Sequence, residues 1–546
     1  MNQRIETEAN SVQTVRQLVD FVAEKHGENL AFVIRSKGAE RTVSYTRFRT
    51  DIGKAAFSLR SSKIRAANIA IVGELCYDWI VAFLGTICSG NVAVPIDKDL
   101  SAEEMSEQLS RANADVVFFD RSCAQKAQHL TENAPERKCI SFEKHEGCES
   151  VEEYLESENM PELGFEASPD AAAILIFTSG TTGVSKIVEL TNRNICDDVY
   201  CCYLFLKDAV KPGDKNIPVL PPHHMFALTA NILTGLYLGA TLCFGGGVKK
   251  ISDTIKYFKP SIMLLVPMIV ESMYKKIWVE AKKQGRERTL KRAIKLSNVL
   301  RKIKIDMRKT LFRDILGNFG GNLKTIICGG AFLEPELVLK YEELGICLRN
   351  GYGITECSPV VACNLNKLNK PGSAGLIAPS PYCDVKIIDG EICVKGSIVM
   401  FEYYKDPAAS KEAFVSGYFK TGDLGYVDRD HYLYITGRKK NLIISSDGNN
   451  ISPEELEILF EKIPLVKSVM ICAEEGPHHA MITARIFPDH GYAADNHIGD
   501  VKEALDAEVK KINAALPSYK RIQQVEVVEA DFQKTALGKI KRYLHS

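Results

Sequence analysis

Short apolar segments separated by longer helical segments constrain the fold of this chain more than any other feature. Six such segments occur: ANIAIVG (67–73), NVAVPI (91–96), ADVVFFD (114–120), AAILIF (172–177), IMLLVP (262–267) and KTIICGG (324–330). Fully apolar strands between helices are typical of parallel sheets that helices cover on both faces. The pattern therefore predicts an α/β fold.

The chain has 546 residues, which is too long for one hydrophobic core and predicts at least two domains. From about residue 385 the pattern changes to alternating strands, and GRKKN (437–441) is a candidate hinge. The residues after it mix strands with helices such as PEELEILFEKI. We expect one domain at 1–438 and a smaller α+β domain at 439–546.

Charge is balanced overall but not locally. Lys+Arg and Asp+Glu number 69 each, so the net charge gives no indication of nucleic-acid binding. Residues 275–313 nevertheless hold 15 Lys and Arg against 3 Asp and Glu. Within this basic stretch Leu300, Ile303, Met307 and Leu311 have helical spacing and predict one apolar stripe. A solvated helical face explains the stretch as well as a binding surface does.

The cysteines and the longest apolar segment indicate in which cellular compartment the protein is expected. None of the 16 cysteines forms a Cys-x-x-Cys pair, which favours buried thiols in a reducing compartment over disulfides or zinc. The N-terminus lacks a signal-peptide core. MFALTANILTGLYLGATLCF (225–244) carries no formal charge, but its Asn, Thr and Gly residues favour a buried helix running into a strand. We expect a cytoplasmic protein without a transmembrane segment.

The loop FTSGTTGVSK (177–186) has the composition of a phosphate-binding turn. Backbone N–H groups in a glycine-rich turn can converge on an anion, and here hydroxyl donors and a lysine accompany them. The spacing does not match the Walker loop GxxxxGK[ST], because Gly183 follows Gly180 too closely and Ile187 follows Lys186. A flexible surface turn remains an alternative for the loop taken alone.

Three later segments carry side chains suited to a nucleotide. RNGYGITECSPV (349–360) contains Tyr352, which can stack on a base, and Glu356, whose carboxylate can hold Mg²⁺. GYFKTGDLGYVDRDHYLYITGRKK contains Asp423, which can accept hydrogen bonds from a ribose diol, and Arg438. QKTALGKIKR (533–542) offers Lys539. Each segment alone has an ordinary structural explanation.

Together and in this order, the four segments resemble the adenylate-forming (AMP-dependent synthetase/ligase) superfamily of acyl-CoA synthetases, peptide-synthetase adenylation domains and luciferases. The resemblance extends from about residue 15 to the C-terminus, and LPPHHMFALT (220–229) is similar to the acyl-site histidine motif of the family. It implies a large N-terminal domain of parallel-sheet α/β subdomains with a small β-barrel-like subdomain. A small mobile α+β domain is expected to follow on a hinge.

The resemblance also implies a role for each matched residue. ATP phosphates are expected at Thr178, Ser179, Gly180, Thr181, Thr182, Gly183 and Lys186, adenine at Gly329, Gly330, Ala331, Tyr352 and Gly353, the α-phosphate at Thr355, and the ribose at Asp423 and Arg438. Glu356 and Thr178 are expected to hold Mg²⁺, and Lys440 to act as the hinge. The expected catalytic residues are Lys539, Thr355, His224 and Lys186. Ser185 and Ile187 depart from the usual Pro and Gly of the family loop, although the lysine between them is retained.

The substrate expectation also comes from the resemblance. GYGITECSPVVACN, HMFALT, the C-terminal segment LPSYKRIQQVEVVEADFQKTALGKIKR and the basic stretch are similar to long-chain fatty acyl-CoA synthetases. A medium- or long-chain fatty acid is therefore expected to form an acyl-adenylate with release of pyrophosphate, and then a thioester with coenzyme A. An acyl carrier protein acting in trans through its phosphopantetheine thiol, or an aryl or other acid, remains an alternative. The basic stretch leaves open an acidic carrier protein or an anionic membrane surface as its partner.

Overall fold

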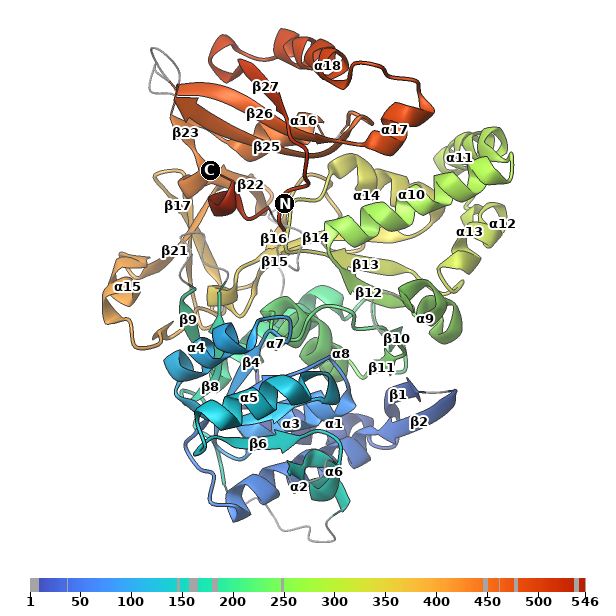
Figure 1. The fold of residues 1–546 in the computed structure, drawn as a ribbon. Coiled ribbons are helices and arrows are strands. Elements are labelled where there is room, and N and C mark those ends of the chain that lie inside the picture. The colour runs from blue at the N-terminus through green and yellow to red at the C-terminus, as the bar shows by residue number, and fades with distance from the viewer. Residues whose placement is uncertain are drawn as a thin grey trace. The chain divides into compact units, whose positions relative to one another are not determined.

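The computed structural model describes residues 9–36, 38–144, 148–156, 165–178, 185–246, 250–444, 450–460, 462–475, 480–534 and 540–545. The chain forms two compact units (Figure 1). Unit 1 comprises residues 1–178, 186–384 and 394–419, and unit 2 comprises residues 179–185, 385–393 and 420–546.

An eight-stranded sheet lies in unit 1, with the strand order β19-β9-β8-β4-β3-β5-β6-β7. Its strands are β3 (Asn68–Val72), β4 (Val92–Ile96), β5 (Ala114–Phe119), β6 (Lys138–Ser141), β7 (Glu149–Ser150), β8 (Ala172–Phe177), β9 (Ile187–Thr191) and β19 (Glu402–Tyr403). β3 pairs in parallel with β4 and β5, and β4 pairs in parallel with β8. The first four apolar segments of the sequence are therefore parallel strands, as predicted.

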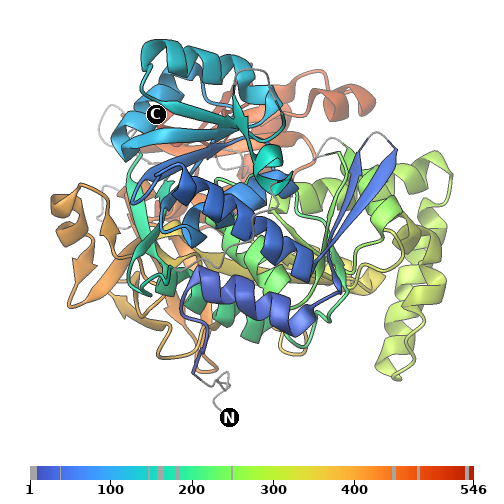
Figure 2. The same ribbon diagram turned by 90° about the horizontal axis from the view of Figure 1, so that it is seen from below.

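Helices cover both faces of this sheet, because its strands are apolar on both. On one face Met105 and Leu109 of α4 (Ala102–Ala112) and Leu130 of α5 (Ala124–Asn133) pack on strand residues such as Val117. On the other face lies α3 (Tyr77–Cys88), packed against α2 (Tyr45–Ser61) and α1 (Val15–His26). The blue helices of this N-terminal part lie toward the viewer in Figure 2.

The second sheet of unit 1 has the strand order β16-β15-β14-β13-β12-β10-β11-β1-β2. Its strands are β1 (Leu30–Ser36), β2 (Ala39–Ser44), β10 (Lys215–Asn216), β11 (Thr241–Phe244), β12 (Ile262–Leu265), β13 (Thr325–Cys328), β14 (Cys347–Gly353), β15 (Val360–Cys363) and β16 (Gly375–Ile377). β12, β13 and β14 run parallel, and β14 turns back into antiparallel β15. Parallel neighbours bring the carboxyl ends of β13 and β14 to one edge of the sheet, where α/β folds bind ligands.

The uncharged segment 225–244 forms a π-helix, η2 (Phe226–Leu233), then α8 (Thr234–Tyr237) and β11. Most of its side chains are buried, which confirms the prediction of a buried helix running into a strand. Among the described residues, no helix has both the length and the apolar character needed to cross a membrane.

The basic stretch does not form the predicted continuous stripe. Helix α11 (Glu287–Lys302) ends before Ile303, Lys304 has a positive φ of 64°, and the short helix α12 begins only at Arg308. Leu300 and Leu311 are half-buried, whereas Ile303 and Met307 face solvent. The spacing was misleading because a left-handed residue interrupts the helix between these apolar residues.

Unit 2 contains the later strands of the chain. β17 (Asp384–Ile388), β18 (Glu391–Lys395), β21 (Tyr418–Val427) and β22 (Tyr432–Arg438) follow one another in the sheet. Further on, β25 (Val466–Glu475), β26 (Ala480–Pro488) and β27 (Gln524–Val527) form a three-stranded sheet. Its core includes Leu456 and Phe460 of α16 (Pro453–Phe460) and Leu505 of α18 (Val501–Ala515). The predicted α/β class is thus confirmed, with α+β structure near the C-terminus.

The thiols agree with the prediction from the sequence. All 16 cysteines are free, and each is buried or half-buried. Burial raises the pKa of many of them, for example that of Cys88 to about 12 and that of Cys363 to about 11. Such thiols are inert packing groups rather than nucleophiles.

Two carboxylates oppose each other at the β9–β19 edge, where Glu402 pairs in register with Glu189. Burial and the Glu402 carboxylate raise the pKa of Glu189. The folded state therefore binds a proton on the Glu189 carboxylate more tightly than the unfolded state does. Stability is highest below the ordinary pKa of glutamate and falls as the pH rises through the raised value.

Replacing Glu189 by glutamine is expected to raise the melting temperature at pH 7 by about 1–2 °C, because like charges directly opposite cost up to about 1 kcal/mol. Thermal melts from pH 4 to pH 8 should show a flatter profile for the variant, with the wild type losing stability toward neutral pH. Glu402→Gln is the matched variant and should act in the same direction. If the melting temperatures of the wild type and both variants change with pH in the same way, repulsion between Glu189 and Glu402 does not lower stability.

Candidate functional site

The predicted phosphate loop connects the two strands of an antiparallel hairpin. β8 and β9 pair up to Phe177 and Ile187, and at the base of the loop the Thr178 N–H donates to the Lys186 carbonyl at 2.9 Å. A Walker loop leads from a strand into a helix. The hairpin therefore agrees with the sequence, whose glycine and lysine spacing does not match a Walker loop. Ser179, Gly180, Thr181, Thr182 and Gly183 lie outside the described residues.

The predicted adenine-binding residues follow two adjacent parallel strands. Gly329, Gly330 and Ala331 leave the end of β13, and Tyr352 and Gly353 end β14 beside it. Gly330 has a φ of +86°, which favours glycine. A Cβ on Gly353 would lie 1.9 Å from the Pro359 carbonyl oxygen, so only glycine fits there. The structure thus brings these five residues to one edge of the sheet.

Glu356 is linked to Lys186 through a residue that the sequence did not single out. The Tyr403 hydroxyl donates to Glu356 Oε1 at 3.0 Å, and Lys186 Nζ lies 4.2 Å from the centre of the Tyr403 ring. Thr355 and Glu356 form a short 3-10 turn, and the Met400 N–H donates to the Glu356 carbonyl at 2.8 Å. Lysine, tyrosine and glutamate therefore form one cluster, which we call the Lys186–Tyr403–Glu356 cluster.

Tyr403 is suited to hold this cluster together because it is 5% exposed and sits on β19, next to β9. Burial and the Glu356 carboxylate raise the pKa of Tyr403 far above its ordinary value. The hydroxyl therefore stays protonated and donates at any physiological pH. The sequence around it, EYYKDP, contains no motif that indicated this position.

Replacing Tyr403 by phenylalanine is expected to lower kcat/KM for ATP about 10- to 100-fold, because a hydrogen bond to a charged group contributes about 1.5–3 kcal/mol. The phenyl ring still lies under Lys186, whereas Tyr403→Leu removes this contact as well and should lower kcat/KM further. A titration of Mg²⁺ separates positioning from loss of folding, since Glu356 is the residue expected to hold Mg²⁺ and a lost Tyr403 contact should shift the Mg²⁺ requirement. If Tyr403→Phe keeps the Mg²⁺ dependence of the wild type, the Tyr403 hydroxyl does not position Glu356.

Helix α7 (Asn192–Leu206) supports the turn that carries Glu356. Asp198, which is fully buried, accepts a hydrogen bond from the Val360 N–H at 2.9 Å. Burial raises the pKa of Asp198 well above its usual range. Asn194 donates through Nδ2 to the carbonyls of Ser397 and Val399 at 2.7 and 2.9 Å. These contacts hold the segments on either side of the cluster.

His224 lies in the loop that leads into η2, two residues before Phe226. A Cβ on Gly329 would lie 3.2 Å from the Phe226 ring, so this loop adjoins the end of β13. The neighbouring His223 lies 3.7 Å from Asp97 through Nε2, and burial lowers its pKa although Asp97 opposes the shift. The His223 and His224 rings lie 4.3 Å apart, so both histidines are in the loop that adjoins the end of β13.

In unit 2, Asp423 and Arg438 face each other across β21 and β22. Arg438 Nε donates to Asp423 Oδ1 at 2.7 Å, and Asp423 is 3% exposed. Lys439 makes a similar pair with buried Glu391 at 2.8 Å, and both Lys439 and the neighbouring Lys440 are exposed. Lys539 lies outside the described residues.

The acidic residues of the site fit a Mg²⁺ ion that arrives with a nucleotide. In the part of the chain that the structure describes, no group of three or more His, Cys, Asp or Glu side chains could hold a metal ion by itself. Mg²⁺ typically uses one or two carboxylates and completes its shell with phosphates and water. Glu356, which is half-buried and linked to Lys186 through Tyr403, meets this requirement, and the Thr178 hydroxyl lies at the base of the loop.

Comparisons with known proteins agree with this geometry. The chain matches the AMP-binding enzyme family over residues 19–404 and the AMP-binding enzyme C-terminal domain over residues 440–544. It is 28% identical over 532 residues to the long-chain-fatty-acid–CoA ligase FadD15 of Mycobacterium bovis, covering 90% of this chain and 88% of that protein. It is 25% identical over 542 residues to the chloroplastic long-chain-fatty-acid–[acyl-carrier-protein] ligase AEE15 of Arabidopsis thaliana, covering 83% of this chain and 74% of that protein.

Solved structures show the same fold. The Mycobacterium tuberculosis fatty acyl CoA synthetase has a TM-score of 0.67 at 23% identity and covers 98% of each chain. The anthranilate CoA ligase AuaEII, in complex with anthranoyl-AMP, has a TM-score of 0.77 at 18% identity and covers 97% of this chain and 96% of its own. Because the first family match spans well over half of the sequence, the chain belongs to the family of AMP-binding enzymes.

Proposed function

We propose that this protein is an AMP-forming acid–thiol ligase that activates a medium- or long-chain fatty acid with ATP and transfers the acyl group to coenzyme A. The observation that carries the proposal is the Lys186–Tyr403–Glu356 cluster beside the glycine-lined ends of β13 and β14. A cation and a carboxylate next to the glycines that end β13 and β14 suit the triphosphate and base of ATP. The similarity to long-chain fatty acid ligases along most of the chain supports the choice of acid.

In the first step a carboxylate oxygen of the fatty acid attacks the α-phosphorus of ATP, and the bond from that phosphorus to pyrophosphate breaks. Negative charge accumulates during this in-line displacement, and positioned cations stabilise it. Lys186 is suited to hold the departing phosphates, Thr355 and Lys539 the α-phosphate, and Asp423 with Arg438 the ribose. Glu356 and Thr178 would hold Mg²⁺, which when bound offsets the phosphate charge.

In the second step a thiol attacks the acyl carbon, loses its proton, and expels AMP as the mixed anhydride bond breaks. Lys539 is required only in the first step. We therefore propose that a domain at 439–546 rotates about Lys440 relative to the domain at 1–438 and admits the thiol after adenylation. His224, next to Phe226 and Gly329, is proposed to border the acyl carboxylate.

Coenzyme A is the proposed thiol, because the relatives from Mycobacterium bovis, Mycobacterium tuberculosis, Cavia porcellus and Mus musculus are named CoA ligases. A phosphopantetheine carrier protein in trans is the second candidate, which the name of the Arabidopsis relative favours. The free thiols support a cytoplasmic location.

The experiment that tests this function is acid-dependent ATP–pyrophosphate exchange without any thiol, across fatty, aryl and amino acids. Exchange that peaks at one fatty chain length supports the proposal, and CoA and carrier protein are then compared on that acid. Exchange with aryl or amino acids alone overturns the substrate but keeps the reaction. Phosphate release in place of pyrophosphate exchange overturns the reaction itself.

We also propose that the outer face of α11 contacts an anionic membrane surface that holds the fatty acid. Leu296 and Val299 of α11, and Ile303 directly after its last residue, are 51%, 59% and 63% exposed. Lys295 and Lys302, next to them in the basic stretch, are also exposed; Figure 1 labels the helix α11 that carries both lysines. Exposed aliphatic side chains framed by lysines suit the interface of an anionic bilayer better than an acidic protein surface, which would pair only with the charges.

Sedimentation with phosphatidylcholine vesicles, with and without phosphatidylglycerol, measures this contact. Val299→Asp combined with Ile303→Asp should abolish binding to the anionic vesicles. The control Ile387→Asp changes an aliphatic residue of unit 2 that is 37% exposed and should leave this binding unchanged. Equal binding by both variants overturns this membrane contact.

A further inference from the structure

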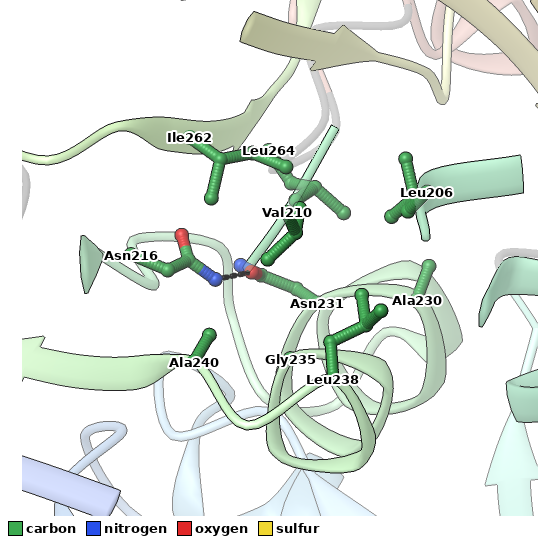
Figure 3. Close-up of a pocket in the computed structure, with 10 residues that line it drawn as sticks. All are labelled: Leu206, Val210, Asn216, Ala230, Asn231, Gly235, Leu238, Ala240, Ile262 and Leu264. Atoms are coloured by element: carbon green, nitrogen blue, oxygen red, sulfur yellow. Dashed lines mark hydrogen bonds between the residues drawn. The ribbon is translucent and has the colours of Figure 1, made fainter. Parts of the chain in front are cut away.

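A buried pair of amides lines a small cavity in unit 1. Asn216 and Asn231 are 2% and 1% exposed, and Asn216 Nδ2 donates to Asn231 Oδ1 at 2.6 Å. The rest of the cavity wall is almost wholly apolar, formed by Leu206, Val210, Ala230, Gly235, Leu238, Ala240, Ile262 and Leu264. Figure 3 shows the two amides meeting among these side chains.

Each amide has a polar atom left over. Asn216 Oδ1 and Asn231 Nδ2 are buried and have no hydrogen-bond partner among the described residues. A buried polar group without a partner costs about 1–3 kcal/mol, so apolar residues of similar size would be expected here unless something fills the cavity. The pair thus leaves one acceptor and one donor unpaired. If the oxygen and nitrogen positions of both amides are exchanged, one acceptor and one donor still remain.

The chemistry of the missing partner follows from this pairing. A neutral hydroxyl accepts from the Nδ2 group and donates to the Oδ1 group, whereas a methyl group does neither and a carboxylate cannot donate. The centre of a water molecule can occupy about 10 Å³ of the cavity, which is room for one water. One O–H group, of water or of a ligand, therefore fits both the size and the polarity of the cavity.

The cavity lies along the same elements that border the candidate site. Asn231 and Ala230 belong to η2, which begins at Phe226 against Gly329. On the sheet, Leu264 pairs with Ile327, two residues before Gly329. The amides are therefore carried by the same helix and sheet that carry Phe226 and Gly329, along which the tail of an acid held near His224 is proposed to extend.

We infer that Asn216 and Asn231 form a specificity-determining site for a hydroxyl group on the acyl tail, occupied by water when the acid is unsubstituted. This inference rests on the proposed function. Gly235 belongs to the site as well, because a Cβ there would lie 3.7 Å from Asn216 Nδ2 and 3.3 Å from Leu242. An acid whose hydroxyl reaches the pair replaces the water and keeps both hydrogen bonds.

The test measures ATP–pyrophosphate exchange with saturated fatty acids and with monohydroxy acids of the same length, the hydroxyl placed at successive carbons. In the wild type one hydroxyl position should give a kcat/KM about 10-fold above that of the parent acid. In the double variant Asn216→Leu with Asn231→Leu this preference should disappear or reverse, while the parent acid is used at least as well. Changing both residues leaves no single amide unpaired, which protects folding.

Asn91→Leu is the matched control, because Asn91 is also a 1% exposed asparagine of unit 1 but hydrogen-bonds elsewhere, to Ser89 and Ile64. It should keep the hydroxyl preference of the wild type. Equal use of hydroxy and parent acids by the wild type, or a preference that survives in the double variant, overturns the inference. Absence of exchange with every fatty acid overturns the proposed function instead.

Discussion

Glu356→Gln is expected to lower kcat/KM for acyl-adenylate formation by about 10²- to 10³-fold. The amide keeps the shape of the side chain, and its oxygen can still accept from Tyr403, but the negative charge that would hold Mg²⁺ is lost. Preorganised charges at a phosphoryl-transfer site commonly contribute about 3–4 kcal/mol to the transition state. The loss should therefore exceed that of Tyr403→Phe, which leaves the charge in place.

The measurement is pyrophosphate exchange over a range of Mg²⁺ concentrations. Glu356→Asp, which retains the charge on a shorter side chain, should recover part of the activity at high Mg²⁺. Glu336→Gln is the matched control, since Glu336 is at the start of α14 (Pro335–Leu344) and pairs with Lys340 at 3.0 Å. Wild-type activity and Mg²⁺ dependence in Glu356→Gln would remove Glu356 from the site.

Lys539→Ala is expected to separate the two half-reactions. Adenylation should fall by about 10²-fold or more, because the cation proposed to bridge the carboxylate and the α-phosphate is removed where charge accumulates. Thioester formation from preformed acyl-adenylate and CoA should stay within about 3-fold of the wild type, since the C-terminal domain is proposed to have rotated away by then.

Single-turnover assays of each half-reaction provide the measurement. Lys541→Ala removes a lysine two positions further along and should leave both half-reactions intact, which controls for a general loss of positive charge. An equal loss in both half-reactions would disprove rotation about Lys440. An unchanged adenylation rate would mean that another cation bridges the two negative groups.

The candidate site divides into parts that could and could not be predicted from the sequence. The glycines at 329, 330 and 353 and the residues Tyr352, Thr355 and Glu356 lie in contiguous motifs, and the structure places them at adjacent strand ends. Their roles toward ATP remain predictions. Tyr403 could not be found in this way, because its significance depends on contacts with two residues far away in the sequence.

The basic stretch shows why spacing alone can mislead. Its apolar residues keep helical spacing through 303–307, but the helix ends at Lys302, and two of the four predicted stripe residues face solvent. Spacing records only the order of side chains, whereas burial depends on which neighbours pack against them. The aliphatic residues left exposed are what indicate a partner for this surface.

The sequence by itself determined the six buried strands, the α/β class and the motifs of an AMP-binding enzyme, because these depend on local apolarity and on residues close together in the chain. Only the tertiary structure decided that Tyr403 joins Lys186 to Glu356, that α11 exposes aliphatic side chains, and that Asn216 and Asn231 meet in one cavity. The physical reason is that hydrogen bonds and burial act through space, so two asparagines on separate elements form a site only after the helix and the sheet have packed together.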